Sequence, residues 1–365
     1  MTIKPQFDCL VIGGGIIGML TARELHLSGV SVGLLDRADT GSESTWAGGG
    51  IISPLYPWQY STAVNQLAQW SQACYAELTG LLKQESGIDP EYVNNGLLIL
   101  DTGEAKQAVD WAEKNGIALQ KINREATTDI EPALGNAPEE ALWLPEVAQV
   151  RNPRLAASVK NSLKNLGVAI FEQTEVTEIK RHNNRVTGVS TSRGDFSGAK
   201  IIVAGGAWTQ QILAPLGTDF KIRPVRGQMV LFEADPGQVQ RIVLSKNRYV
   251  IPRRDGRILV GSTLEEVGFD KSTTETAIQE LRQEAIRIIP GLANKSITHH
   301  WAGLRPGSVA GIPYICKHPE LEGLFINAGH YRNGVVLGPA SARLMADIVL
   351  ERTPIIESKF YHIEK

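Results

Sequence analysis

The most constraining stretch of this sequence is a glycine-rich turn between two apolar segments. Residues 13–18 read Gly-Gly-Gly-Ile-Ile-Gly, a G-x-G-x-x-G pattern that directly follows the continuous apolar run 7–12. A helical pattern then ends at Gly29, a second apolar run covers 30–35, and Asp36 closes it. A glycine turn from a buried strand into a helix, with an acid about 20 residues later, is typical of dinucleotide binding. We therefore predict a parallel βαβ unit here.

The three glycines have separate roles in this prediction. Gly13 permits the tight turn, Gly15 lets the backbone approach a pyrophosphate, and Gly18 lets the helix pack close to the sheet. The helix N-terminus attracts phosphate charge. Asp36 can accept hydrogen bonds from ribose hydroxyls.

Bulk properties exclude several classes of protein. The 365 residues carry a net charge of −2, which gives no basic field for nucleic acid or an anionic membrane. No apolar run reaches the roughly 20 residues that a membrane span needs. The N-terminus does not resemble a signal peptide, and Cys9, Cys74 and Cys316 are too few and scattered for a disulfide framework or a zinc site. We expect a cytoplasmic protein without a metal, and oligomerisation stays open.

Three later features favour FAD over NAD as the dinucleotide. The small-residue loop 42–54 suits contact with a flat ring system. Strands expected at 168–179, 185–192 and 199–204 form a meander that returns to a glycine-rich strand end, whereas NAD dehydrogenases usually continue with further βαβ units. A late strand, turn and helix over 323–351 suits a cofactor long enough to touch both ends of the chain.

The sequence resembles the D-amino acid oxidase superfamily of flavoproteins, and within it the glycine oxidases linked to thiamine biosynthesis. The resemblance covers nearly the whole chain. It rests on seven sequence motifs: VIGGGIIG (11–18), STWAGGGI (44–51), IIVAGGAW (201–208), PVRGQ (224–228), RYVIPRRDGRILVGST (248–263), WAGLRPGS (301–308) and GHYRNGVVLGP (329–339).

The resemblance implies non-covalent FAD, with Asp36 and Arg37 near the adenosine ribose and Val176 at the adenine. The cofactor contacts that we expect are Gly13, Gly15, Ile16, Ile17, Gly18, Asp36, Arg37, Ser44, Thr45, Gly49, Gly50, Ile51, Val176, Gly205, His330, Tyr331, Arg332, Asn333, Gly334, Val335 and Val336. Sarcosine oxidases, a sister group, attach the flavin to a late cysteine. Cys316 lies too close to Gly329 for that pattern, and we interpret it as a small buried residue.

The group of an amino acid substrate that a binding site can hold most strongly is its carboxylate. An arginine can bind a carboxylate through two charge-assisted hydrogen bonds. Arg305 and Arg332 both stand among aromatic, glycine and proline residues rather than among other charges. The resemblance makes Arg305 the carboxylate-binding residue and Arg332 a nearby site residue. Tyr249 is a third candidate, as a neutral donor to the same carboxylate. Asn247 stands where glycine oxidases often have a histidine, which leaves the preferred amino acid open.

Other conspicuous residues favour structural interpretations. Tyr56, Trp58 and Tyr60 could line an active-site lid or simply pack in the core. His299 and His300 are neighbours on an expected strand and should point in opposite directions, which argues against a shared metal. Asn152 is expected to cap a helix over 153–166, with proline in its first turn. Leu20, Leu25 and Leu27 should lie on the apolar face of the first helix.

Together these features predict an α/β fold with a Rossmann-like FAD-binding domain of the glutathione-reductase type. An inserted α+β substrate domain is built on an antiparallel sheet. We expect the FAD domain to comprise 1–85, 145–215 and 305–365, and the substrate domain 86–144 and 216–304.

The expected activity is oxidation of glycine, sarcosine or a small D-amino acid. A hydride passes from the substrate Cα to flavin N5, and oxygen reoxidises the flavin to give hydrogen peroxide. The imine product could feed thiazole synthesis for thiamine. The alternatives are a dehydrogenase that passes electrons to a carrier or quinone, a tRNA-modifying oxidase and a flavin-binding module without activity.

Overall fold

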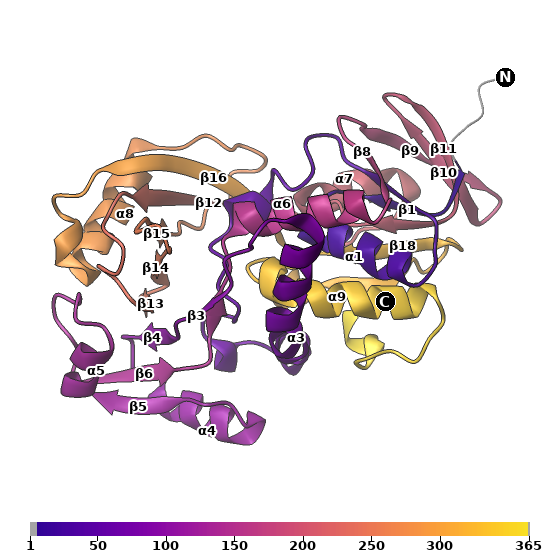
Figure 1. The fold of residues 1–365 in the computed structure, drawn as a ribbon. Helices are drawn as coiled ribbons and strands as arrows, with labels where there is room; N and C mark the ends of the chain where they lie inside the picture. The colour runs from indigo at the N-terminus through magenta and orange to yellow at the C-terminus, as the bar shows by residue number, and fades with distance from the viewer. Residues whose placement is uncertain (1–5, 364–365) are drawn as a thin grey trace.

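The computed structural model describes residues 6–363, and its strands form two large sheets (Figure 1). The first sheet has the order β17-β18-β11-β1-β2-β8, with β10 and β9 attached to β11. Its strands are β1 (Gln6–Ile12), β2 (Val32–Leu35), β8 (Ala169–Phe171), β9 (Val176–His182), β10 (Arg185–Thr191), β11 (Gly194–Val203), β17 (Tyr314–Lys317) and β18 (Leu324–Ala328). The central strands are parallel, so their carboxyl ends lie at one edge.

The second sheet has the order β16-β12-β15-β14-β13-β4-β6-β5, and every neighbouring pair is antiparallel except β13 and β4. Its strands are β4 (Leu97–Ile99), β5 (Gln120–Asn123), β6 (Glu140–Leu144), β12 (Arg223–Phe232), β13 (Ile242–Ser245), β14 (Arg248–Pro252), β15 (Ile258–Gly261) and β16 (Ile297–Gly307). In Figure 1 this sheet lies on the left, and β12 and β16 form its edge toward the first sheet.

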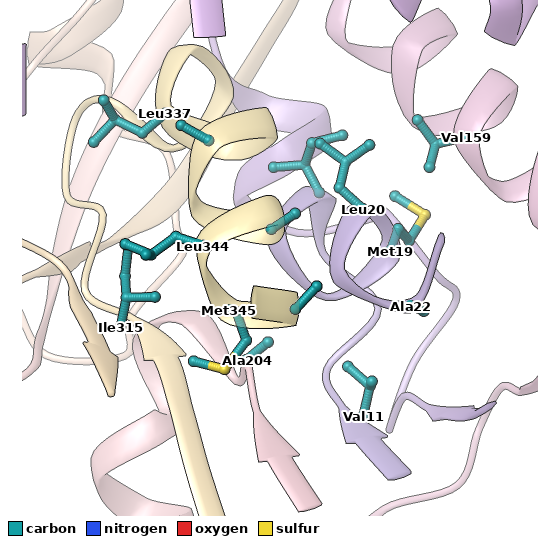
Figure 2. Packing of buried hydrophobic residues seen from close by; sticks show 14 of the residues in the cluster. Val11, Met19, Leu20, Ala22, Val159, Ala204, Ile315, Leu337, Leu344 and Met345 are labelled. Atoms are coloured by element: carbon teal, nitrogen blue, oxygen red, sulfur yellow. The ribbon is translucent and has the colours of Figure 1, made fainter. Parts of the chain in front are cut away.

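Four helices pack together beside the first sheet and bury its largest hydrophobic cluster. They are α1 (Ile16–Leu27), α3 (Thr62–Ser86), α6 (Asn152–Asn165) and α9 (Gly334–Val349). Figure 2 shows Leu20 of α1 between the helices and Leu344 and Met345 of α9 above Ala204. Because α1 follows the first strand and α9 the last, this core joins the two ends of the chain.

Five further α-helices and a pair of short strands complete the part of the fold that residues 6–363 describe. They are α2 (Ser44–Ala47), α4 (Ala105–Asn115), α5 (Arg124–Ile130), α7 (Thr209–Leu213), α8 (Glu275–Ile288) and the paired strands β3 (Val93–Asn94) and β7 (Ala148–Gln149). Within residues 6–363, no helix is both long and apolar enough to cross a membrane.

The predicted βαβ unit is confirmed as β1, α1 and β2, with β1 and β2 parallel. Gly13 has a φ of +108°, which L-residues with a side chain rarely adopt. A Cβ on Gly18 would lie 1.8 Å from the carbonyl oxygen of Gly13, so only glycine allows α1 to begin this close to the turn.

Three local predictions were wrong. The segment 168–179 is two strands, because the chain breaks at Gln173 (φ +52°) and the amide of Thr174 donates to the Asp36 carbonyl. Leu27 is 54% exposed, since it falls on the outer side of the last turn of α1. Asn152 lies inside α6 rather than capping it, and its amide Nδ2 donates to the carbonyl of Thr45 at 2.7 Å.

We keep the division into an FAD domain and a substrate domain as a proposal. Every strand of the second sheet comes from 86–144 and 216–304, except that β16 continues to Gly307. The outermost residues of the proposed FAD domain, 1–5 and 364–365, lie outside the described residues.

Candidate active site

A cavity of about 900 Å³ opens at the carboxyl ends of the parallel strands. Ile12, Leu35, Ala204 and Ala328, at or just after the ends of four of these strands, line it. This edge is the usual ligand site of open α/β sheets, and the volume is near the upper end for ligand pockets, ~1,000 Å³. Arg305 of β16 lines the same cavity, which therefore borders both sheets.

The glycine turn forms one wall. A Cβ on Gly13 would lie 2.4 Å from the carbonyl oxygen of Ala204, so the turn touches the end of β11 directly. The amide of Gly14 donates to Oδ2 of Asp36 at 2.6 Å, and the amide of Ile16 donates to Oγ1 of Thr45 at 2.8 Å. Burial raises the pKa of Asp36, and the N–H groups of Ala38 and Gly14 oppose that shift. Asp36 therefore holds the turn as well as facing the cavity.

A second wall is the glycine stretch 48–50, which lies between the two sheets. A Cβ on Gly49 would meet Ile251 at 3.1 Å and the ring of Tyr249 at 3.3 Å. Gly50 has a φ of +81°, and a Cβ there would lie 2.1 Å from the carbonyl oxygen of Val150. Side chains at these positions would push the wall into the cavity or away from β14.

Arg253 fixes this wall from behind. Its Nη2 donates to the carbonyl of Gly49 at 2.8 Å, and its Nη1 donates to the carbonyl of Val150 at 3.0 Å and to Oε1 of Gln149 at 2.6 Å. Burial lowers the pKa of Arg253 to about 10. Its role is to hold the backbone of the wall to the second sheet.

The third wall is the loop before α9, which carries buried polar groups. His330 is 1% exposed, and its Nε2 lies 3.0 Å from Oγ of Ser341. Burial lowers the pKa of His330 to about 3, so the ring is neutral near pH 7. Two buried polar atoms of cavity-lining residues have no partner among the described residues: Nδ2 of Asn333 and Oδ1 of Asn327.

These walls fit FAD. Leaving a buried polar atom without a hydrogen bond costs about 1–3 kcal/mol of folding free energy. Nδ2 of Asn333 is a donor and Oδ1 of Asn327 is an acceptor, so the pair suits a ligand that carries both donors and acceptors. The N-terminus of α1 suits a pyrophosphate, although the amide of Ile16 already donates to Thr45. At Gly15, the nearest atom to a Cβ would be Oγ1 of Thr45 at 3.5 Å, so the backbone is open for close approach.

Arg305 lies at the junction of the two sheets. Its Nη2 donates to Oγ of Ser262 at 2.6 Å, and its Nη1 to the carbonyl of Thr263 at 3.3 Å. Within residues 6–363, no carboxylate lies at ion-pair distance from it. Burial lowers the pKa of Arg305; Tyr249 opposes the shift and Arg332 adds to it. The guanidinium is thus a positive charge that lines a cavity without an acidic partner from the chain.

Tyr249 and Arg332 lie near Arg305, since both affect its pKa. Tyr249 is buried, and its hydroxyl donates to Sδ of Met229 at 3.7 Å, a weak partner. Arg332 is half-buried and makes no hydrogen bond or ion pair with another described residue. Arg332 therefore keeps a charge for which the described residues offer no partner, whereas the hydroxyl of Tyr249 interacts with both Met229 and the guanidinium of Arg305.

The structure brings together nearly all the residues predicted for the site. Every one of them lines the cavity except Gly18, which packs against Gly13. Asn247 does not line it: with Lys246 it forms the tight turn between β13 and β14, where both residues have positive φ. Cys316 is buried in β17, as predicted, and burial raises its pKa to about 12.

Of the three aromatic residues of the possible lid, Tyr56 and Trp58 pack into the core and Tyr60 is half-buried beside the helical cluster. The hydroxyl of Tyr56 donates to Asp101 at 2.8 Å, and Nε1 of Trp58 donates to Glu104 at 2.6 Å. Both side chains are buried, and neither lines the cavity. Among the described residues, no cluster of three or more metal-ligating side chains occurs, and His300 lines a separate hollow beside Trp46.

Sequence reasoning missed several residues that shape the site. Ser262 follows β15 and contacts Arg305, Gly227 lies beneath the guanidinium, and Trp208 lines the cavity next to Arg37. Ser262 and Gly227 occur in quoted motifs, but no periodicity distinguishes them from structural residues. Arg253 stands in a run of charged residues beside a turn, a pattern that does not distinguish a buried arginine from an exposed one.

Known proteins resemble this chain over nearly its full length. It is 49% identical to a glycine oxidase of Pseudomonas aeruginosa, over 96% of this chain and 97% of that protein. It is 32% identical to a bifunctional protein ThiO/ThiG of Nostoc, over 94% of this chain and 53% of that protein. The crystal structure of glycine oxidase from Geobacillus kaustophilus superposes with a TM-score of 0.94 at 28% identity, covering 99% of both chains.

The sequence also matches the family model described as FAD dependent oxidoreductase over residues 8–348. That match spans the glycine turn, the wall 48–50, Arg305 and α9. The resemblance and the FAD cofactor predicted from the motifs are thereby confirmed. This chain belongs to the family of FAD-dependent oxidoreductases that includes the glycine oxidases.

Proposed function

We propose that this protein oxidises glycine, sarcosine and small D-amino acids with oxygen as the electron acceptor. The observation that carries the proposal is Arg305, a cation in the cavity wall without an acidic partner among residues 6–363. Taking such a charge out of water is costly unless a ligand pairs with it. A substrate carboxylate would supply the missing partner.

The neighbouring residues suit the rest of a small amino acid. The hydroxyl of Tyr249 can turn from the sulfur of Met229 to donate to the same carboxylate. Arg332 adds a second positive charge to this part of the cavity. Ile51, Met229 and the ring of Tyr249 belong to one apolar cluster, which favours an apolar substrate side chain over a charged one.

In this proposal the chain binds and orients the substrate and excludes water. Gly13, Gly15, the wall 48–50 and the loop before α9 would hold FAD. When bound, FAD accepts the hydride that leaves the substrate Cα, and it is reoxidised by oxygen to give hydrogen peroxide. The imine product hydrolyses to a 2-oxo acid and ammonia. The relationship to glycine oxidase of Pseudomonas aeruginosa supports glycine as a substrate.

We also propose a role in the synthesis of the thiamine thiazole. The Nostoc relative supports this, because the part similar to this chain makes up about half of a bifunctional protein named ThiO/ThiG. In that role the imine would be used by a second enzyme before it hydrolyses.

The test is anaerobic reduction of the purified holoenzyme. Glycine, sarcosine, D-alanine, D-proline and a set of L-amino acids are mixed with it in turn, and the loss of flavin absorbance is recorded. Air is then admitted, and hydrogen peroxide is measured. Glycine should reduce the flavin of an oxidase and so remove its absorbance. If unbound glycine is removed before air is admitted, the reduced enzyme should return about one hydrogen peroxide per flavin at once. Bleaching with slow reoxidation would point to a dehydrogenase, and no bleaching by any amino acid would overturn the proposal.

A further inference from the structure

A long segment between β15 and α8 reaches from the second sheet to the wall of the FAD cavity. It covers residues 262–274, and we call it the clasp segment. Three of its apolar side chains are conspicuously exposed: Leu264 (53%), Val267 (40%) and Phe269 (39%). Of the three, Phe269 alone packs against another aromatic ring, so Leu264 and Val267 can serve as controls within the same segment.

Phe269 packs against Trp208, which follows β11. The two ring centroids are 5.6 Å apart, and the ring planes are inclined by 31°. The guanidinium carbon of Arg37 lies over the same indole ring, 3.8 Å from its centroid. Trp208 and Arg37 line the cavity, whereas Phe269 does not. Phe269 therefore supports a part of the cavity wall from outside.

Lys271 contacts the same wall through an ion pair with Glu43. Its Nζ lies 3.0 Å from Oε1 of Glu43, and Glu43 in turn lies 3.6 Å from Nη2 of Arg37. Glu43 also lines the cavity. Two side chains of the clasp segment thus reach the group formed by Arg37, Glu43 and Trp208, next to Asp36.

The clasp segment is itself held in place. The side chain of Arg226 is 5% exposed, and it bonds to Asp270 and Glu265 at 2.6 Å each and to the carbonyl of Ser272 at 3.0 Å. These partners flank Phe269 and Lys271 in sequence. Because the backbone around them is anchored, the two side chains are presented to the wall with little loss of conformational freedom on contact.

We propose that the clasp segment retains the cofactor: Phe269 and Lys271 hold the wall formed by Arg37, Glu43 and Trp208 closed over the end of the cavity beside Asp36. FAD can leave through this end only when the wall moves, so the clasp slows its release. The proposal rests on FAD as the cofactor and is independent of which amino acid the enzyme oxidises.

The test is the rate of FAD release without substrate. Holoenzyme is diluted into buffer lacking FAD, and the rise in free-flavin fluorescence gives the rate constant. Phe269→Ala should raise it by about 2- to 10-fold, the range expected for one lost aromatic pair. Lys271→Ala should raise it by about 2-fold at low salt and less at high salt, as for an exposed ion pair.

Leu264→Ala and Val267→Ala are the matched controls, since they remove exposed apolar side chains of the same segment that make no aromatic contact with the wall. Both should release FAD at the wild-type rate. The proposal is overturned if Phe269→Ala releases FAD no faster than Val267→Ala. A failure of glycine to reduce the flavin would refute the proposed function and would leave these rates unaffected.

Discussion

The guanidinium of Arg305 lies directly over Gly227 of the neighbouring strand, where a Cβ would come within 2.0 Å of Nη1 and 2.2 Å of Nη2. The backbone partner of Arg305 in this ladder is Val225, so its side chain leans diagonally across β12. Ser262 and Thr263 hold it from the other side. The position of the cation therefore depends on a missing side chain as well as on its hydrogen bonds.

Gly227→Ala should displace Arg305 and weaken substrate binding. Losing a well-aligned charge-assisted hydrogen bond costs about 1.5–3 kcal/mol, so KM for glycine should rise by roughly 10- to 100-fold. FAD content should stay the same, because Gly227 lies on the second sheet, away from the glycine turn. Gly103→Ala, where a Cβ would meet nothing within 4 Å, is the control. Equal KM values in the two variants would contradict this role.

Asp36→Ala should weaken FAD binding, because the carboxylate accepts from the amides of Gly14 and Ala38 and so holds the glycine turn. Loss of hydrogen bonds to a charged group should raise the dissociation constant of FAD by roughly 10- to 100-fold. Equilibrium titration of apoprotein with FAD measures the effect. Asp39→Ala, which removes an exposed carboxylate outside the cavity, should bind FAD like the wild type.

His330 should make the protein less stable in acid. Its folded pKa is about 3, below the unfolded value near 6.5, so the unfolded state binds more protons between these two pH values. Its contribution is fully present above pH ~6.5 and falls by about 1.4 kcal/mol per pH unit on acidification toward pH 3. Urea unfolding of holoenzyme at pH 7.5, 6 and 5 should show a smaller loss for His330→Gln. The exposed His182→Gln should behave like the wild type, and identical losses in all three proteins would refute the assignment.

Arg253→Met should lower the free energy of unfolding by about 2–5 kcal/mol, because the carbonyls of Gly49 and Val150 would lose a charged donor. Arg254→Met removes an exposed ion pair to Asp89 and should cost about 0–1 kcal/mol. Urea unfolding compares the two neighbours directly. A cost for Arg253→Met no larger than that for Arg254→Met would show that the wall does not need this arginine.

The parts of the first sheet and of the cofactor site that depend on residues close together in the sequence were predictable. The glycine turn, the apolar strands and Asp36 occur within 30 residues, and each follows from backbone geometry. The break of 168–179 into two strands was not predictable, because it depends on the Thr174 amide reaching the Asp36 carbonyl over a distance of 138 residues in sequence, 174 minus 36. Propensity alone favours one continuous strand there.

The residues around Arg305 could be predicted only in part, because their arrangement depends on contacts between segments far apart in the sequence. Arg305 and Tyr249 could be named from their motifs, but their neighbours Gly227 and Ser262 become visible only when β12, β15 and β16 pair. Arg253 was missed because a run of charged residues beside a turn normally lies in solvent. Leu27 was misplaced because helical periodicity identifies an apolar face but not where the sheet beneath it ends.

Ligand titration of the oxidised holoenzyme tests most directly whether Arg305 binds a carboxylate beside the flavin. Acetate and acetamide have nearly the same shape, but only acetate carries a charge, and flavin absorbance can follow the binding of each. The wild type should bind acetate at least about 10-fold more tightly than acetamide, and Arg305→Met should bind both equally with FAD content unchanged. If Arg305→Met kept the wild-type preference for acetate, the carboxylate would be bound elsewhere.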